Sequence, residues 1–459
     1  MSIRNSIIFL GAVAFLYIFS VLGTGCAQIG MPIGGPRDSL PPVLVSSTPP
    51  NLSTHFNANR IVLTFDEYVQ IQDLQNNLLV SPTPKINPVI NYKLKTVSIK
   101  LRDTLMDNTT YSIQLGNAIQ DINENNPLTG FNYVFSTGSY IDSLTFSGSV
   151  TLAETGKTDT TLLVFLYNDL TDSAVFKHKP KYIARVNNKG DFTFHHLAEG
   201  TYNVFALKDE SGQKVYNNPT QIFAFADSTI AVPASQPVKL YAYAEEKPFT
   251  KPAALKPESK LTFTTSLNGG VQDLLSPFSL TFSNELKNFD SSKIALTDTN
   301  LVKINTITLS IDSTKKIIAV NNNWPEETQF KLIIDSTFTT DTSGNQLAKS
   351  DTLAFVTAKE RDYGSIKINF TNLDKFAHPV LQFVTNNEVV QSFPITSTSW
   401  SKKLFKPGDY ELRILDDSNE NGIWDPGNYH LRRQPEKVYN IPQSVNIRAN
   451  WENERDIIL

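Results

Sequence analysis

Apolar and polar residues alternate in short runs along most of this chain, and this alternation limits the possible folds more than any other feature. Ile61, Leu63 and Phe65 form one such run. Because successive side chains of a strand point to opposite faces, a period of two with one apolar face is typical of half-buried strands. Turn-forming residues separate the runs about every eight to twelve residues, as in small β-sandwiches. Similar runs occupy residues 97–101 and 111–115, and turn signals occur at 81–84, 107–108 and 123–127.

Two stretches of the chain repeat one pattern. Residues 63–67 recur as residues 280–284, and the Phe-Ser-Thr at 135–137 recurs as Phe-Val-Thr at 355–357. The separation stays between 217 and 220 residues, as expected for two copies of one domain. We therefore predict an Ig-like domain A1 at 41–138 and a second copy, A2, at 260–358.

The segments after each copy also match one another. Gly200 and Tyr202 correspond to Gly408 and Tyr410, and Leu207 with Asp209 corresponds to Leu415 with Asp417, always 208 residues apart. These segments predict two smaller sandwiches, with a charged and proline-rich linker between the halves. The predicted fold is all-β, with four tandem β-sandwich domains in the order A-B-A-B. The smaller domains are B1 at 139–244 and B2 at 359–459, and the linker is at 245–259.

The N-terminal residues are typical of an export signal. Arg4 precedes an apolar segment at 7–22, and Cys26, the only cysteine among 459 residues, follows it. This order is typical of a secretory signal, and the position of the cysteine resembles a bacterial lipoprotein signal. We predict a lipoprotein signal peptide at 1–25, a lipid such as palmitate on Cys26, and a flexible tether at 26–40. The alternative is an uncleaved signal anchor, because about 19 apolar residues can just span a bilayer.

Charge and cysteine content exclude several classes of protein. The formal net charge is -4, so no broad basic field would attract nucleic acid. Because no cysteine follows Cys26, the exported part has neither disulfides nor thiolate metal sites. Its domains must be stabilised by apolar burial and backbone pairing, which is feasible at this length.

Familiar catalytic motifs are absent from the sequence. It has no His-Glu-x-x-His, no Gly-x-Ser-x-Gly and no phosphate-binding glycine loop. His195 and His196 are adjacent, so on a strand they would point to opposite faces and could not bind one ion. Asp66 and Glu67 are replaced in the second copy by Ser-Asn at 283–284, which favours solvation of a strand end over catalysis. We predict that the protein is not an enzyme and requires no cofactor.

Residues 417–425 contain the best-formed local motif. Oxygen-bearing groups stand at alternate positions, a glycine at the sixth and an acid at the ninth, which matches the first half of a calcium loop. Position twelve is Asn428 instead of glutamate and strands flank the motif, so it is not an EF-hand. We predict a calcium site or, alternatively, a tight Asn-Gly turn with solvated acids. The calcium ligands would be Asp417, Asn419, Asn421, Ile423 and Asp425.

Three tryptophans, Trp400, Trp424 and Trp451, fall in the predicted B2. They could form a stacking platform for a sugar or a docking patch. The alternative, which the usual burial of tryptophan favours, is that at least two of them pack in the sandwich core.

A recurring tripeptide resembles the O-glycan acceptor of Bacteroidota: Asp, then Ser or Thr, then Ala, Leu, Ile, Val, Met or Thr. Short Asp-Thr turns are common in sandwiches, so turn formation is the other explanation. The predicted acceptors are Ser39, Thr104, Ser143, Thr160, Ser173, Ser228, Ser313, Ser336 and Thr352.

Longer motifs resemble known domain families. The Leu-Thr-Phe at 63–65 and the Phe-Ser-Thr-Gly at 135–138 resemble bacterial Ig-like domains of the S-layer type. B1 resembles prealbumin-like or carboxypeptidase-regulatory-like sandwiches through residues 190–202, of which B2 keeps 406–410. The whole chain looks like the Ig-like domain lipoproteins of Bacteroidota, a resemblance that assigns no activity.

Together these features predict a non-enzymatic, lipid-anchored protein of the outer membrane that acts as a structural scaffold or interaction module. The alternative is a carbohydrate- or protein-binding lipoprotein with a calcium-stiffened loop in its C-terminal domain. The expected partners are the membrane, through the lipid, and an envelope protein or glycan, but not nucleic acid. Residues 27–36 lack the acidic residues that favour surface display in this group, so we predict the periplasmic face.

Overall fold

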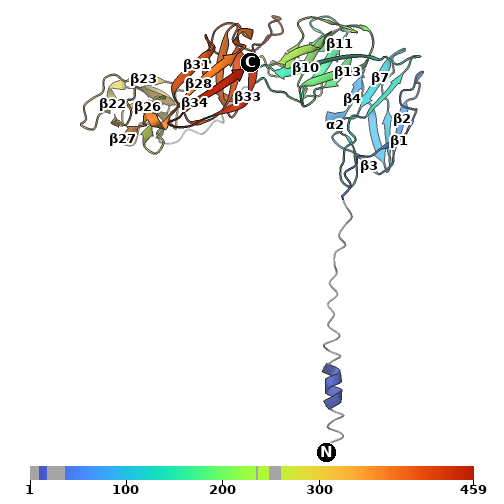
Figure 1. Cartoon of the computed structure of the whole chain (residues 1–459), viewed down its shortest axis with the longest axis horizontal. Helices are drawn as coiled ribbons and strands as arrows, with labels where there is room; N and C mark the ends of the chain where they lie inside the picture. Colours follow the sequence, from blue (N-terminus) through green and yellow to red (C-terminus); the bar gives the residue numbers. More distant parts are fainter. Residues whose placement is uncertain (1–9, 18–36, 234–235, 248–259) are drawn as a thin grey trace, which may run out of the picture.

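The computed structural model describes residues 10–17, 37–233, 236–247 and 260–459. Residues 10–17 are helical, and none of the helices in these ranges is long and apolar enough to cross a membrane. Two one-turn α-helices and three short 3₁₀ helices accompany the strands (Figure 1). The predicted all-β fold is therefore confirmed. The short helices are α2 (Leu74–Asn77), α3 (Ala174–Lys177) and the 3₁₀ segments Ser291–Lys293, Glu360–Asp362 and Leu373–Lys375.

Domain A1 packs two sheets face to face. One has the strand order β1-β2-β6-β5, the other β4-β7-β9, and β3 pairs with β8. Ile61, Leu63 and Phe65 of β2 are buried while the residues between them are not, which is the alternation that the sequence predicts. The strands are β1 (Leu44–Thr48), β2 (Arg60–Phe65), β3 (Val69–Ile71), β4 (Leu79–Ser81), β5 (Val89–Lys93), β6 (Thr96–Lys100), β7 (Thr110–Gln114), β8 (Ile119–Asp121) and β9 (Asn132–Ser136).

Domain A2 repeats this arrangement. Its sheet β18-β20-β24-β23 corresponds to the first sheet of A1, and β22, β25 and β27 correspond to β4, β7 and β9. The pair β21-β26 corresponds to β3-β8, and β19 runs parallel to β27. The strands are β18 (Phe263–Thr265), β19 (Val271–Gln272), β20 (Phe278–Phe282), β21 (Leu286–Phe289), β22 (Ile294–Thr297), β23 (Thr308–Ile311), β24 (Ile317–Asn321), β25 (Gln329–Ile334), β26 (Thr339–Asp341) and β27 (Asp351–Thr357).

Domain B1 pairs a three-stranded sheet, β13-β10-β17, with a larger sheet, β12-β11-β14-β15. The last strand, β17, runs parallel to β10, and β16 also pairs with β14. The strands are β10 (Leu144–Leu152), β11 (Leu163–Tyr167), β12 (Tyr182–Arg185), β13 (Asp191–Leu197), β14 (Gly200–Leu207), β15 (Phe223–Phe225), β16 (Ile230–Val232) and β17 (Val238–Ala242).

Domain B2 has the same plan, with sheets β31-β28-β34 and β30-β29-β32-β33. Its last strand again lies parallel to its first. Tyr202 and Tyr410 show the correspondence in detail, because each donates its hydroxyl proton to the carbonyl four residues earlier, at 2.8 and 3.0 Å. The strands are β28 (Gly364–Thr371), β29 (Pro379–Thr385), β30 (Glu388–Pro394), β31 (Ser399–Phe405), β32 (Gly408–Asp416), β33 (Lys437–Ile447) and β34 (Glu452–Ile458).

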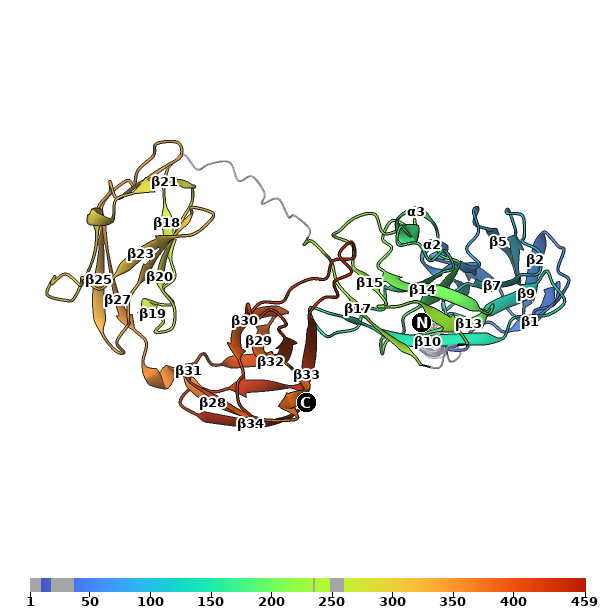
Figure 2. The ribbon, with the colours of Figure 1, turned by 90° about the horizontal axis from the view of Figure 1, so that it is seen from above.

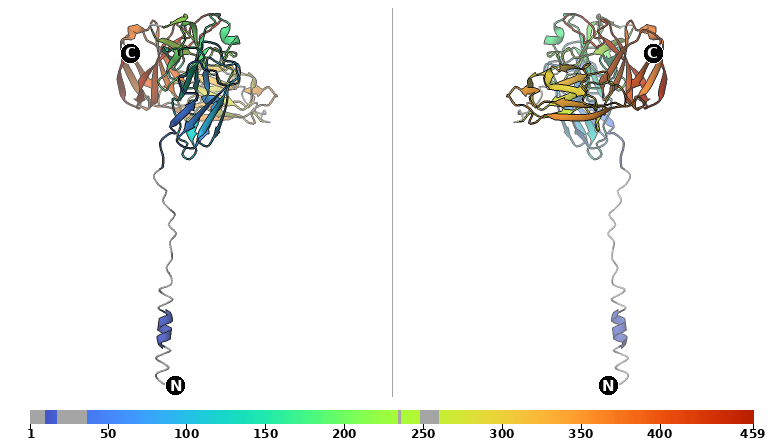
Figure 3. Two further views of the ribbon diagram at one scale, coloured as in Figure 1. Left: turned by 90° about the vertical axis from the view of Figure 1, so that its right-hand side faces the viewer. Right: turned by 90° about the vertical axis from the view of Figure 1, so that its left-hand side faces the viewer.

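The order of the domains in space differs from their order in the chain. Side-by-side strands join A1 to B1, where Ile183 N–H donates to Ser81 Oγ at 3.2 Å. B1 touches B2, where Val438 N–H donates to the Ala153 carbonyl at 3.0 Å. Figure 2 shows the resulting string, A1-B1-B2-A2, with A2 next to B2 at one end. Figure 3 looks along this string from its two ends.

Candidate functional site in the loop between β32 and β33

The loop at 417–436 leaves the edge of B2 and reaches the outer face of the larger B1 sheet (Figure 2). It contains the motif that the sequence singles out, and its tip carries Tyr429. This side chain is only 2% exposed, and it belongs to a hydrophobic cluster formed mostly by B1. The loop is thus the main contact between two domains that are separated in the chain by A2.

Tyr429 occupies an aromatic socket on B1. Its ring centroid lies 5.1 to 5.7 Å from those of Phe176, Phe205, Phe223 and Phe225. Its hydroxyl donates a hydrogen bond to the Asp172 carbonyl at 3.1 Å. Burial raises the pKa of this phenol to about 12, so it stays a neutral donor. Several edge-on aromatic contacts around one ring favour a single orientation of the loop tip.

Polar contacts surround the socket and hold the loop in place. Glu245, just after the last B1 strand, accepts hydrogen bonds from Tyr429 N–H at 3.1 Å and from Asn428 Nδ2 at 3.2 Å. Arg432 pairs with Asp172 and lies over the Tyr429 ring, 4.5 Å from its centroid. Apolar burial at the centre with polar pairing at the rim is the organisation of a specific interface.

The base of the loop is closed by two buried carboxylates. Asp417 is 2% exposed and accepts hydrogen bonds from Gly422 N–H at 2.7 Å and Asn421 N–H at 3.3 Å. Glu436 accepts from Ser418 N–H at 2.8 Å and Asp425 N–H at 3.0 Å. Because these donors belong to the loop itself, the loop base is ordered by its own hydrogen bonds.

Three of the predicted calcium ligands come together. The Nδ2 atoms of Asn419 and Asn421 each lie 2.7 Å from the same carboxylate oxygen of Asp425. An amide presents an oxygen instead after a half-turn, so this set fits a hard cation in donor type. Asp417 points into the turn, and the Ile423 side chain is 64% exposed. In the part of the chain described here, no cluster of three or more His, Cys, Asp or Glu could hold a metal ion.

The other polar residues considered in the sequence are not gathered in a site. His195 is exposed, whereas His196 Nδ1 lies 3.0 Å from the Asp142 carbonyl. Asp66 accepts from Val43 N–H at 2.8 Å, and the pKa of Glu67 is raised by burial and by the neighbouring charges of Asp121 and Asp66.

The three tryptophans lie in different places and do not form a common platform. Trp400 packs against Phe393 and Phe383 in the B2 core, with centroids 4.9 and 5.7 Å apart. Trp424 is partly buried beside the B1-B2 contact and donates to the Glu436 carbonyl at 2.8 Å. Trp451 is 60% exposed. Two of the three thus pack against apolar clusters, as the core interpretation predicts.

The predicted glycan acceptors are mostly at the surface. Seven are exposed, and Ser173 and Ser336 are half-buried. The aspartates before Thr160 and Ser313 each accept hydrogen bonds from the residue that follows the acceptor, so these acceptors lie at the tips of tight turns. Turn formation and modification are therefore compatible at these positions. Cys26, the proposed lipid site, lies outside the described residues.

The sequence analysis missed Tyr429. The available signal was the length of the loop: 20 residues, 417–436, separate β32 from β33 and contain an unpatterned aromatic and basic run at 428–433. The corresponding B1 loop, 208–222, is shorter. A long loop with apolar residues in a small sandwich commonly has a binding role.

Comparison with known proteins identifies a family for one domain. Residues 38–137 match the bacterial Ig-like domain family, which confirms the Ig-like part of the predicted resemblance. No relative was found among the curated proteins.

Solved structures similar to this chain include two bacterial major pilins. BcpA of Bacillus cereus is 12% identical, covers 69% of this chain and 99% of its own, and has a TM-score of 0.17. SpaD of Corynebacterium diphtheriae is 10% identical, with coverages of 69% and 97% and a TM-score of 0.16. Alpha-2-macroglobulin from Escherichia coli, domains MG0-NIE-MG1, is 11% identical, with coverages of 40% and 71% and a TM-score of 0.20. Similarity at this level carries no functional argument.

Proposed function

We propose that the chain is a non-enzymatic, lipid-anchored protein of the cell envelope that acts as a structural scaffold. The observation that supports this most is the insertion of Tyr429 of B2 into the aromatic socket of B1. Domains joined only by linkers move freely unless an apolar interface holds them. This interface makes one A1-B1-B2-A2 string out of two A-B pairs, and such a string suits the spacing of other envelope components.

The proposed anchor is a lipid on Cys26, in the outer membrane and at its periplasmic face. Growth with labelled palmitate tests it: the protein should take up label and sediment with membranes. Cys26→Ala should lose both properties, whereas Met31→Ala, in the same tether, should keep them. Label that persists in Cys26→Ala would reject this anchor.

The scaffold role predicts neighbours that depend on the joint. Crosslinking in cells followed by purification should recover the same envelope components with the wild type and with Tyr140→Ala, which changes an exposed tyrosine (65% exposed). Tyr429→Ala should lose part of this set, because the spacing of the domain surfaces is no longer held. An unchanged set would argue against a scaffold that depends on the B1-B2 contact.

We also propose O-glycans at several Asp-Ser and Asp-Thr tripeptides. The exported protein should then be heavier than the same chain made without export, and the added mass should fall when exposed acceptors such as Thr160 and Ser313 are changed to Ala. Equal masses would exclude modification.

A second candidate function is a binding module with a calcium-stiffened loop. It is supported by the convergence of Asn419 and Asn421 on Asp425. When bound, calcium would add positive charge that orders these oxygens. Calcium at 100 times its Kd should stabilise the fold by about 2.7 kcal/mol. The melting shift should vanish in Asn421→Ala and remain in Asp209→Ala, the corresponding B1 loop. A glycan array with and without calcium would then identify sugar ligands.

A further inference from the structure

The two A domains share an aromatic cross-strand pair at one end of the sandwich. Tyr111 of β7 lies opposite Phe135 of β9 in A1, with ring centroids 5.2 Å apart. Phe330 of β25 lies opposite Phe355 of β27 in A2, with centroids 5.8 Å apart. The two pairs are equivalent because β7 and β9 correspond to β25 and β27. They provide a reference for comparing what covers each pair.

A conserved hydrogen-bond arrangement between the copies aligns the preceding loops. Thr137 Oγ1 donates to the Met106 carbonyl at 2.7 Å and accepts from Thr109 N–H at 3.0 Å. Thr357 Oγ1 makes the same two bonds, to the Pro325 carbonyl and from Thr328 N–H. Met106 therefore corresponds to Pro325. One residue earlier, Leu105 of A1 corresponds to Trp324 of A2.

In A2 the tryptophan fills the end of the core. Trp324 is 6% exposed, and its ring packs edge-on against Phe330 and Phe355, with centroids 5.6 and 5.8 Å away. This fold therefore accommodates an indole ring on the aromatic pair.

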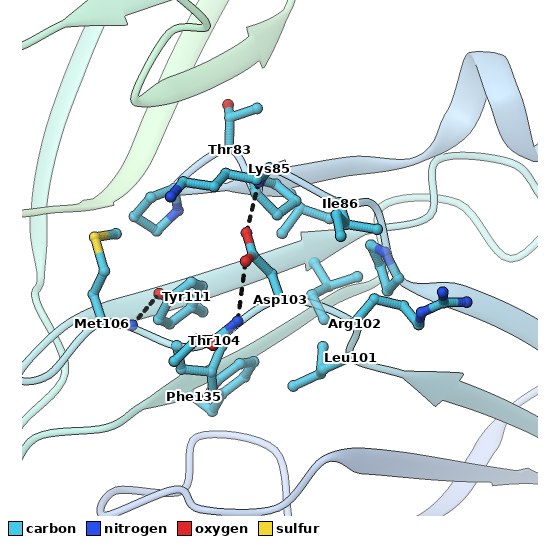
Figure 4. A pocket seen from close by; sticks show the side chains of 16 residues that line it. Thr83, Lys85, Ile86, Leu101, Arg102, Asp103, Thr104, Met106, Tyr111 and Phe135 are labelled. Atoms are coloured by element: carbon cyan, nitrogen blue, oxygen red, sulfur yellow. Dashed lines mark hydrogen bonds between the residues drawn. The ribbon is translucent and has the colours of Figure 1, made fainter.

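In A1 the corresponding side chain is smaller, and a cavity of about 320 Å³ is present (Figure 4). Leu105, Tyr111 and Phe135 line it, so it lies beside the same aromatic pair. Cavities of this size are at the lower end of the range for small ligands. Native cores rarely contain large apolar voids, since an empty cavity forfeits van der Waals contacts.

The cavity also has a polar group suited to a ring N–H. The Asp103 carboxylate lies among the lining side chains (Figure 4) and accepts one hydrogen bond on each oxygen, from Lys85 N–H at 2.6 Å and Thr104 N–H at 3.0 Å. A carboxylate has about four acceptor positions, so it can still accept from an indole nitrogen.

We propose that the A1 cavity is a binding site for one aromatic ring system of indole size. The ring would stack at the Tyr111-Phe135 pair, where Trp324 packs in A2, with its N–H near Asp103. It can come from a free small molecule or from a tryptophan side chain of a partner polypeptide. This site is in a different domain from the loop contact, so it stands or falls separately from the scaffold role.

Calorimetric titration of the full chain with 3-methylindole tests the proposal, using protein made without export so that Thr104 is unmodified. We expect one binding site in the wild type. Leu105→Trp, which copies A2 into A1, should fill the cavity, weaken binding at least tenfold and raise the melting temperature. No binding to the wild type, or unchanged binding to a folded Leu105→Trp variant, would overturn the proposal.

The reciprocal variant provides a second measure. Trp324→Leu should open the equivalent space in A2 and raise the stoichiometry from one to two, provided its melting curve still shows a folded A2. If it does not fold, the Leu105→Trp result decides alone. A Gly-Gly-Trp-Gly-Gly peptide distinguishes the sources: binding that Leu105→Trp abolishes indicates a polypeptide partner, and binding of 3-methylindole alone indicates a free aromatic molecule.

Discussion

The backbone N–H of Tyr429 donates a hydrogen bond to the Glu245 carboxylate at 3.1 Å, although the two residues are 184 positions apart. Glu245 directly follows B1, and Tyr429 is at the tip of a B2 loop. The contact therefore closes a long loop of chain that contains the whole of A2. Because the entropy of loop closure grows slowly with length, a compact aromatic interface can compensate for such a closure.

Tyr429→Ala should separate B1 from B2. Removing a buried aromatic side chain typically costs about 3–5 kcal/mol, and here most of that loss falls on the interface. We expect a larger maximum dimension in small-angle X-ray scattering. Tyr140→Ala, at an exposed position, should leave the scattering curve unchanged. Identical curves for both variants and the wild type would contradict an interface that depends on Tyr429.

Gly427→Ala should disturb the same joint by crowding. A Cβ at this position would lie 2.5 Å from Cζ of Tyr243 and 2.9 Å from the Arg433 carbonyl. Overpacking of this kind costs about 1–3 kcal/mol. Denaturant unfolding of Gly427→Ala, Tyr243→Ala and the double variant should show a coupling of at least about 0.5 kcal/mol, because removing the ring relieves part of the clash. Strict additivity would show that the ring does not limit this position.

Acid should destabilise A1 through Asp121. Burial raises the pKa of this carboxyl, but hydrogen bonds from the N–H groups of Glu124, Asn126 and Asn125 lower it by more, so the pKa lies below its ordinary value of 3.8. A lowered folded pKa means that the stabilisation is complete above the unfolded pKa and is lost as pH falls through the folded one.

Unfolding between pH 7 and pH 2 measures this effect. Asp121→Asn should cost about 2 kcal/mol at pH 7, since hydrogen bonds to a charged acceptor are lost, and should reduce the loss of stability below about pH 4. Asp341 is the corresponding residue of A2, and its pKa is also lowered, with burial opposing and the Asn345 and Asn284 amides prevailing. Asp341→Asn should behave alike. An acid limb as steep as that of the wild type would refute the assignment.

Tyr202→Phe and Tyr410→Phe should destabilise B1 and B2 by similar amounts. Each removes one hydrogen bond to a carbonyl, from Tyr202 to Ala198 and from Tyr410 to Lys406, without changing the ring packing. The expected loss is about 1 kcal/mol for each, measured by thermal melting. A much larger effect in one domain would mean that the two tyrosines are not structurally equivalent.

The sequence by itself determined the strands and the repeats of this protein. The alternation at 61–65 is local, because each residue's side of the sheet follows from its parity, and Ile61, Leu63 and Phe65 are buried as predicted. The match of Tyr202 with Tyr410 was also readable, since both serve the same bond within a single domain. The echo of Asp121 by Asp341 was visible too, although not that both carboxylates order a loop.

Only the tertiary structure decided which domains touch and which cavities remain. The Tyr429 socket combines Phe176, Phe205, Phe223 and Phe225 from several elements of B1, and no local pattern relates them to a loop some 200 residues later. Likewise, Leu105 and Trp324 are ordinary apolar residues in the sequence. Their difference matters because packing is a sum over neighbours that the chain brings together only after folding.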